Sequence, residues 1–107
     1  MKTADMKKTM FDEVIKKEGR LVLVDYWAPW CMYCRRIAPA LDKVAEQYGD
    51  KIMIAKVNID EEPALAEQER IEVIPTMVIY RDGEAVDSIV APDSKAKIEE
   101  LIQKYAG

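Results

Sequence analysis

Two short apolar runs on either side of one amphipathic segment place the strongest constraint on how this chain can fold. Residues 21–24 form an apolar run, largely β-branched or leucine, that is typical of a strand buried on both faces. From Cys31 to Tyr48 the apolar residues recur at helical spacing, and Gly49 is suited to end that helix. A second apolar run covers residues 52–59. A strand, a helix and a further buried strand predict a βαβ unit with parallel strands.

The remaining segments predict three more helices and a hairpin. The helices are expected from about Thr9 to Gly19, from Pro63 to about Arg70, and after the N-cap candidates Asp93 and Ser94. The dipeptide Asp82-Gly83, between apolar runs at 77–80 and 85–90, predicts a two-residue turn. Because no linker or repeat divides the 107 residues, we expect one α/β domain over residues 1–107 with a mixed sheet.

Composition and charge argue against several classes of partner. The formal net charge is −4 and no basic block is present, so nucleic acid and anionic lipid are not expected partners. No apolar run approaches the roughly 20 residues that a membrane helix needs, so we expect no membrane partner. Residues 1–8 are polar and lack the apolar stretch of a secretory signal. We therefore expect a cytoplasmic protein.

The two cysteines, Cys31 and Cys34, are spaced for chemistry rather than for stapling the chain. A disulfide between them closes so small a loop that its entropic stabilisation is roughly 2 kcal/mol at best. Cys31 falls where the long helix begins, and the unpaired N–H groups there favour a thiolate, which is the reactive form. We expect Cys31 to attack a disulfide, and Cys34, nearly one turn deeper, to resolve the mixed disulfide.

A metal site is the alternative reading of a Cys-x-x-Cys pair. Zinc takes four ligands, and the chain has no other cysteine and no histidine. Two copies of the chain could share one ion, and this alternative stays open. The position of the pair between a strand and a helix favours redox chemistry, and we expect no metal.

The residues around the cysteines resemble the thioredoxin family. The similar segments run from Val24 to Pro39, from Lys56 to Asp60, from Val73 to Thr76 and from Arg81 to Gly83. The resemblance covers the chain from Phe11 onward. It implies the thioredoxin fold, a central mixed sheet of four to five strands flanked by four helices. It also implies a monomer that reduces protein disulfides, needs no cofactor beyond its cysteine pair, and receives electrons from a thioredoxin reductase or another donor.

The resemblance implies a proton-transfer role for Asp25, which is expected at the end of its strand. Burial below the cysteines would raise the pKa of this carboxyl group, which would then accept the proton of Cys34 through water. Lys56 would lie nearby and tune the titration. A solvated carboxylate at Asp25 and a strand-edge cation at Lys56 are the alternatives.

The resemblance also implies how substrate docks. Pro75 would be cis and opposite the cysteines, leaving the backbone of Ile74 free to pair with a substrate peptide. A simple proline at the start of a strand is the alternative, since about 5% of X–Pro bonds are cis in folded proteins. Trp30 would supply an exposed apolar docking surface, and Trp27 would shield the site from below.

Four features depart from the family pattern. Met32-Tyr33 stands where Gly-Pro is usual between the cysteines, and Ala91-Pro92 begins where the family has a glycine in its substrate groove. We expect Met32, Tyr33 and Ala91 to contact substrate. Arg70 and Val73 replace two glycines that commonly precede the cis-proline. Residues 1–8 lack the alternation of a first strand, so that strand is uncertain.

Three functions are consistent with these features. The leading one is a thiol–disulfide reductase for protein disulfides. The alternative is a more oxidising disulfide oxidase or isomerase, because loss of Gly-Pro between the cysteines makes the pair more oxidising in this family. A change of 30 mV corresponds to about 1.4 kcal/mol for such a couple, so a few contacts to the Cys31 thiolate decide the direction. A non-catalytic binding module is disfavoured, because both cysteines, Asp25 and Pro75 are retained.

Overall fold

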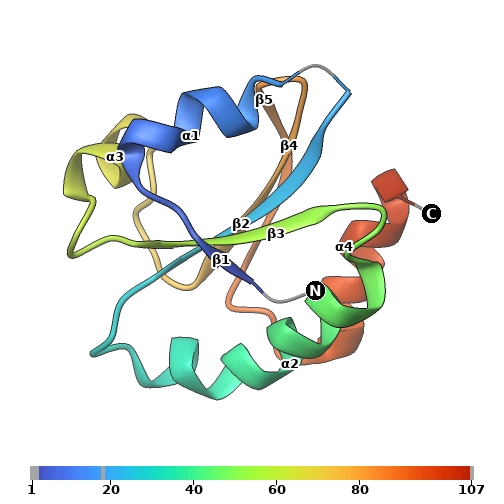
Figure 1. Cartoon of the computed structure of the whole chain (residues 1–107). Coiled ribbons are helices and arrows are strands. Elements are labelled where there is room, and N and C mark those ends of the chain that lie inside the picture. Colours follow the sequence, from blue (N-terminus) through green and yellow to red (C-terminus); the bar gives the residue numbers. More distant parts are fainter. Residues whose placement is uncertain (1–2, 18, 107) are drawn as a thin grey trace.

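The structure, a computed structural model, describes residues 3–17 and 19–106 and places one sheet between two layers of helices (Figure 1). In this part of the chain the sheet has five strands: β1 (Ala4–Asp5), β2 (Leu21–Trp27), β3 (Met53–Asn58), β4 (Thr76–Arg81) and β5 (Glu84–Val90). The helices are α1 (Lys8–Ile15), α2 (Met32–Tyr48), α3 (Pro63–Gln68) and α4 (Lys95–Ala106). The predicted α/β class with a mixed sheet is confirmed.

The strand order is β1-β3-β2-β4-β5, and it contains the predicted βαβ unit. Strands β2 and β3 are parallel and are joined through α2, with Val24 opposite Ala55. Strand β4 is antiparallel to β2, and β5 is antiparallel to β4. The turn between β4 and β5 consists of Asp82 and Gly83, both with positive φ (51° and 89°), as a two-residue hairpin of this kind requires. The predicted hairpin is confirmed.

Each face of the sheet is covered by two helices because the central strands are apolar on both faces (Figure 1). Leu23 of β2 packs with the buried residues of α2 and α4, among them Leu41 and Ile102. Its neighbours Val22 and Val24 point to the opposite face, where Phe11 of α1 and Leu65 of α3 cover them. Side chains two apart on β2 therefore share a face, which decides where Asp25 lies.

Several element boundaries differ from the sequence prediction. Strand β2 continues to Trp27, so Asp25 lies inside the strand and not at its end. Helix α1 begins at Lys8 without a side-chain cap, whereas the start was expected at Thr9. Helix α3 ends at Gln68, shortly before Arg70, whose φ of 58° does not fit a right-handed helix.

Both ends of the domain also form secondary structure. The uncertain first strand exists as β1, a two-residue strand that pairs in parallel with β3, Ala4 opposite Ala55. At the other end, Ser94 Oγ accepts a hydrogen bond of 3.3 Å from the N–H of Lys97, as expected of an N-cap. Among the described residues, no helix has the length and apolar character needed to span a membrane.

Candidate active site

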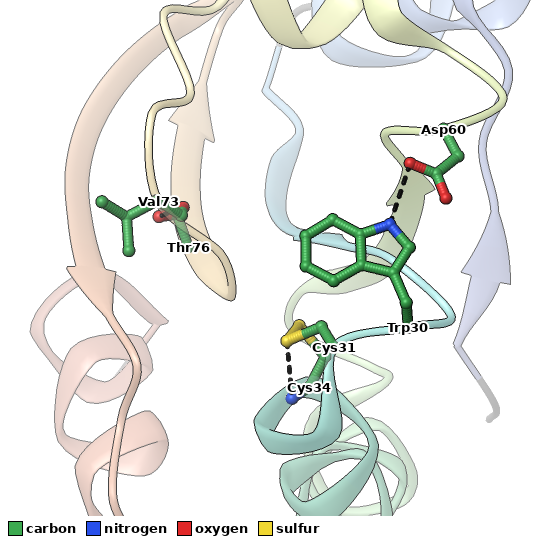
Figure 2. Close-up of a disulfide and its surroundings, with 6 residues drawn as sticks. All are labelled: Trp30, Cys31, Cys34, Asp60, Val73 and Thr76. Carbon is green, nitrogen blue, oxygen red and sulfur yellow. Dashed lines mark hydrogen bonds between the residues drawn. A yellow bond between two sulfur atoms is a disulfide. The ribbon is translucent and has the colours of Figure 1, made fainter.

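The cysteine pair lies at the point where the chain enters α2. Cys31 is the N-cap of this helix, and Cys34 belongs to its first turn. The two form a disulfide with their Cα atoms 5.3 Å apart. Sγ of Cys31 accepts a hydrogen bond of 3.1 Å from the N–H of Cys34 (Figure 2). A donor N–H and a helix N-terminus both stabilise negative charge, which a thiolate at this sulfur would carry.

The two sulfurs differ in access to solvent. The exposed fraction of Cys31 is 8%, and that of Cys34 is only 2%. Both pack on the buried Ala28, whose carbonyl accepts the N–H of Cys31 at 3.1 Å. Trp27 packs against the same cluster. Cys31 is therefore the better placed of the two to meet a bulky disulfide.

Asp25 lies in the sheet on the face that α2 covers. It is two residues from Leu23 on β2, so its side chain points to the same face, and it lies nearer the end of the strand from which α2 begins. Only 1% of its surface is exposed, and within the described residues neither carboxyl oxygen has a hydrogen-bond partner. Burial raises the pKa of Asp25 from 3.8 to about 7, and the positive charge of Lys56 opposes this rise.

Lys56 is the direct register partner of Asp25 across the parallel β2–β3 pair. Its Nζ lies 4.5 Å from the centre of the Trp27 ring, on which the ammonium group packs. Lys56 is half-buried, so its charge is partly screened by solvent. It is close enough to influence the Asp25 titration, yet desolvation remains the larger effect.

Trp30 forms an exposed apolar surface beside the disulfide. Its side chain is 65% exposed, which is unusual for tryptophan. The indole Nε1–H donates a 3.2 Å hydrogen bond to Oδ1 of Asp60, which orients the ring (Figure 2). Sequence reasoning assigned no role to Asp60, although it ends one of the family-like segments. No local pattern in the sequence indicates this pairing, because the two residues are 30 positions apart.

A segment from the start of β4 lies opposite the cysteines. Figure 2 shows Val73 and Thr76 on this segment, across from the disulfide and the Trp30 ring. The Ile74–Pro75 peptide bond is cis, the geometry that the resemblance implies. Thr76 Oγ1 donates to the carbonyl oxygen of Val73, which braces the turn. Ile74 packs against the cysteine cluster, and Val73 is 54% exposed.

The two residues between the cysteines have different environments. The side chain of Met32 is 74% exposed, so it adds to the exposed apolar surface of the site. Tyr33 is half-buried, and its hydroxyl donates to the carbonyl oxygen of Pro92 at 2.9 Å. Ala91 is exposed and has a positive φ of 45°. Its N–H donates a 2.8 Å hydrogen bond to the carbonyl of Pro75, so the Ala91 turn also belongs to the site.

Most of the predicted site residues thus lie at one end of the sheet, in the segments around the disulfide. Asp25 and Lys56 lie in the strands β2 and β3. Among the described residues, no three side chains of the metal-ligating types His, Cys, Asp and Glu come together as a metal site. The arrangement offers a disulfide at a helix N-terminus, a buried carboxyl group of raised pKa and a surrounding apolar surface.

Comparisons with known proteins agree with this geometry. The thioredoxin family model matches residues 2–104. Thioredoxin 1 of Synechococcus elongatus is 41% identical over 95 residues, covering 89% of this chain and 89% of that protein. The chloroplastic M-type thioredoxin of Pisum sativum is 42% identical over 95 residues, which are 89% of this chain and 55% of that protein. A solved Plasmodium falciparum thioredoxin aligns with a TM-score of 0.89 and 35% identity over 97% of this chain and 100% of its own.

Proposed function

The chain belongs to the thioredoxin family, and we propose that Cys31 is the nucleophile and Cys34 the resolving thiol of its reaction. The expected fold and family are confirmed, and the protein is a thiol–disulfide oxidoreductase, a protein-disulfide reductase that carries electrons. The observation that supports the assignment of roles is the position of Cys31 as the N-cap of α2, with the N–H of Cys34 directed at its sulfur.

In the first step the Cys31 thiolate attacks one sulfur of a substrate disulfide. A bond forms between Cys31 and that sulfur, the substrate disulfide breaks, and the other substrate sulfur leaves as a thiolate. The greater exposure of Cys31 compared with Cys34, 8% against 2%, supports this order. The helix N-terminus favours the attacking anion at Cys31.

In the second step Cys34 attacks the sulfur of Cys31 and releases the reduced substrate. Cys34 must first lose its proton, and Asp25 is proposed to accept it through water. A pKa of about 7 suits this task, because such a group is partly ionised near neutral pH and binds a proton firmly enough to take it. Lys56 tunes the proton affinity of Asp25 through its positive charge. The resulting Cys31–Cys34 disulfide is the state that the structure contains.

The substrate peptide is proposed to dock along Ile74, between Trp30 and the Ala91 turn. Within the described part of the chain, neither the N–H nor the C=O of Ile74 takes part in a backbone hydrogen bond, so both remain available for an added strand. Exposed Trp30, Met32 and Val73 supply apolar contacts on either side of the disulfide. Ala91 is exposed in the turn that follows β5, and it contributes to the same groove.

We propose that the redox equivalents reside in the cysteine pair alone, without a bound cofactor. Each turnover leaves the disulfide of Cys31 and Cys34, so a separate donor must return two electrons and two protons. A thioredoxin reductase is the proposed donor, and the protein is proposed to act on its substrates as a monomer. A reducing compartment such as the cytoplasm suits this cycle. Fractionation of cells that express the tagged full-length protein tests the location.

Reduction of insulin disulfides in the presence of dithiothreitol tests the proposed function. The wild-type protein should accelerate the reaction, and Cys31→Ser should remove the acceleration. No acceleration by the wild type would contradict the reductase activity.

The reduction potential measured against glutathione tests the direction of electron transfer, because a value well above the cytosolic poise would indicate an oxidant.

The substitution Asp25→Asn tests the proton-transfer role of Asp25. It should slow release of the reduced product more than the first attack, and equal slowing of both steps would contradict that role.

A further inference from the structure

Tyr33 connects the three segments that surround the disulfide. It belongs to the first turn of α2, between the two cysteines. Its hydroxyl donates to the carbonyl oxygen of Pro92 at 2.9 Å and lies 3.4 Å from that of Ala91. The N–H of Ala91 in turn donates to the carbonyl of Pro75 at 2.8 Å. A continuous chain of hydrogen bonds therefore runs from the cysteine turn through the Ala91 turn to the Ile74–Pro75 segment.

The Ala91 turn has a backbone conformation that needs such support. With φ at 45°, Ala91 occupies the left-handed region, which its Cβ disfavours. Non-glycine residues keep such conformations when their surroundings hold them there. Here the backbone bond to Pro75 holds one side of the turn, and the Tyr33 hydroxyl holds the other. Of these two contacts, only the second comes from a side chain and can be removed by substitution.

We propose that the Tyr33 hydroxyl is a positioning group that holds the Ala91–Pro92 turn against Pro75 and thereby fixes one wall of the groove for the substrate peptide. The inference rests on the proposed function of the groove. It assigns to Tyr33 a task that is independent of thiol chemistry, since the hydroxyl is directed at backbone carbonyls. A disulfide too small to occupy the groove should not depend on this wall, whereas a protein disulfide should.

The substitution Tyr33→Phe tests the proposal, because it keeps the ring and removes only the hydroxyl. The second-order rate constant of the pre-reduced protein with insulin should fall by roughly threefold to tenfold, the effect of losing one hydrogen bond. With hydroxyethyl disulfide it should stay within about twofold of wild type. Tyr48→Phe is the matched control: it removes another hydroxyl from α2, bonded to Glu99 instead of the groove, and should change neither rate constant.

Coupling to Ala91→Gly separates positioning from a general loss of structure. Glycine adopts a positive φ without penalty, so the turn needs less support in an Ala91→Gly background. In that background, the fold-reduction of the insulin rate constant caused by Tyr33→Phe should be less than half of the fold-reduction that the same change causes in the wild-type protein. An unchanged insulin rate constant for Tyr33→Phe, or equal slowing with both disulfides, would overturn the proposal. If the wild type reduced neither disulfide, the proposed function itself would fail, and this inference with it.

Discussion

Asp25 and Lys56 are direct partners across the parallel strands β2 and β3. The lysine side chain does not neutralise the carboxyl group, because its Nζ packs on the Trp27 ring and both carboxyl oxygens lack a hydrogen-bond partner within the described residues. Burial therefore dominates, and the pKa of Asp25 rises to about 7. The protein keeps an unfavourable buried carboxyl group in its sheet, on the face that α2 covers.

The first prediction concerns stability and pH. Asp25 has a higher pKa in the folded state than in the unfolded state, so the folded protein binds its proton more tightly between pH 3.8 and about 7. The stability that this group contributes is fully present below pH 3.8 and is lost as the pH rises through about 7. The total loss in the free energy of unfolding is about 4 kcal/mol. Denaturant unfolding of the oxidised protein should show Asp25→Asn gaining stability over wild type from pH 4 to pH 8.

Asp50→Asn is the control for this experiment, because Asp50 is exposed. Its stability relative to wild type should be nearly constant over the same pH range. A difference between Asp25→Asn and wild type that does not grow with pH would contradict the burial account of the raised pKa.

The second prediction concerns a chain of hydrogen bonds on the face of the sheet opposite to that of Asp25. The hydroxyl groups of Tyr26 and Tyr80 are 2.6 Å apart, and that of Tyr80 donates to Glu69 at 2.8 Å. Tyr80→Phe leaves the fully buried Tyr26 hydroxyl without this partner, which should cost about 1–3 kcal/mol of unfolding free energy. The double variant with Tyr26→Phe should lose less than the sum of the single losses, and strict additivity in urea unfolding would contradict the coupling.

The third prediction concerns Arg70, an exposed residue with φ at 58°. Glycine tolerates this conformation, so Arg70→Gly should raise the unfolding free energy by about 0.5–1 kcal/mol after the greater entropy of unfolded glycine is subtracted. Arg36→Gly, in the exposed part of α2, should instead lower it by about 1 kcal/mol. Equal destabilisation by both changes would show that the left-handed conformation carries no strain.

The sequence was sufficient to predict the βαβ unit, the hairpin and the position of the cysteines, because these depend on local patterns. The apolar runs of β2 and β3 have no competing interpretation as exposed segments, and Asp82-Gly83 fits only a tight turn. The end of β2 was predicted wrongly. The hydrophobic pattern predicts that the strand ends at Asp25, because a carboxyl group is not expected inside a buried strand, whereas β2 continues to Trp27.

Contacts between distant segments could not be derived from the sequence. The bond from Trp30 to Asp60 and the bond from Tyr33 to Pro92 join residues 30 and 59 positions apart. No local pattern in the sequence indicates either pairing. They become visible only when the sheet brings the ends of β3, β4 and β5 to the N-terminus of α2. Motifs therefore predict candidate site residues, but they do not predict the distant partners that support those residues.

Trapping of the mixed disulfide tests the central claim most directly. Cys34→Ser keeps the attacking thiol and removes the resolving one, so after incubation with insulin, mass spectrometry should find a covalent adduct through Cys31. Cys31→Ser should give little or no adduct, because the remaining Cys34 is almost fully buried. An adduct that forms equally well with Cys31→Ser, or only with it, would contradict the assignment of Cys31 as the nucleophile.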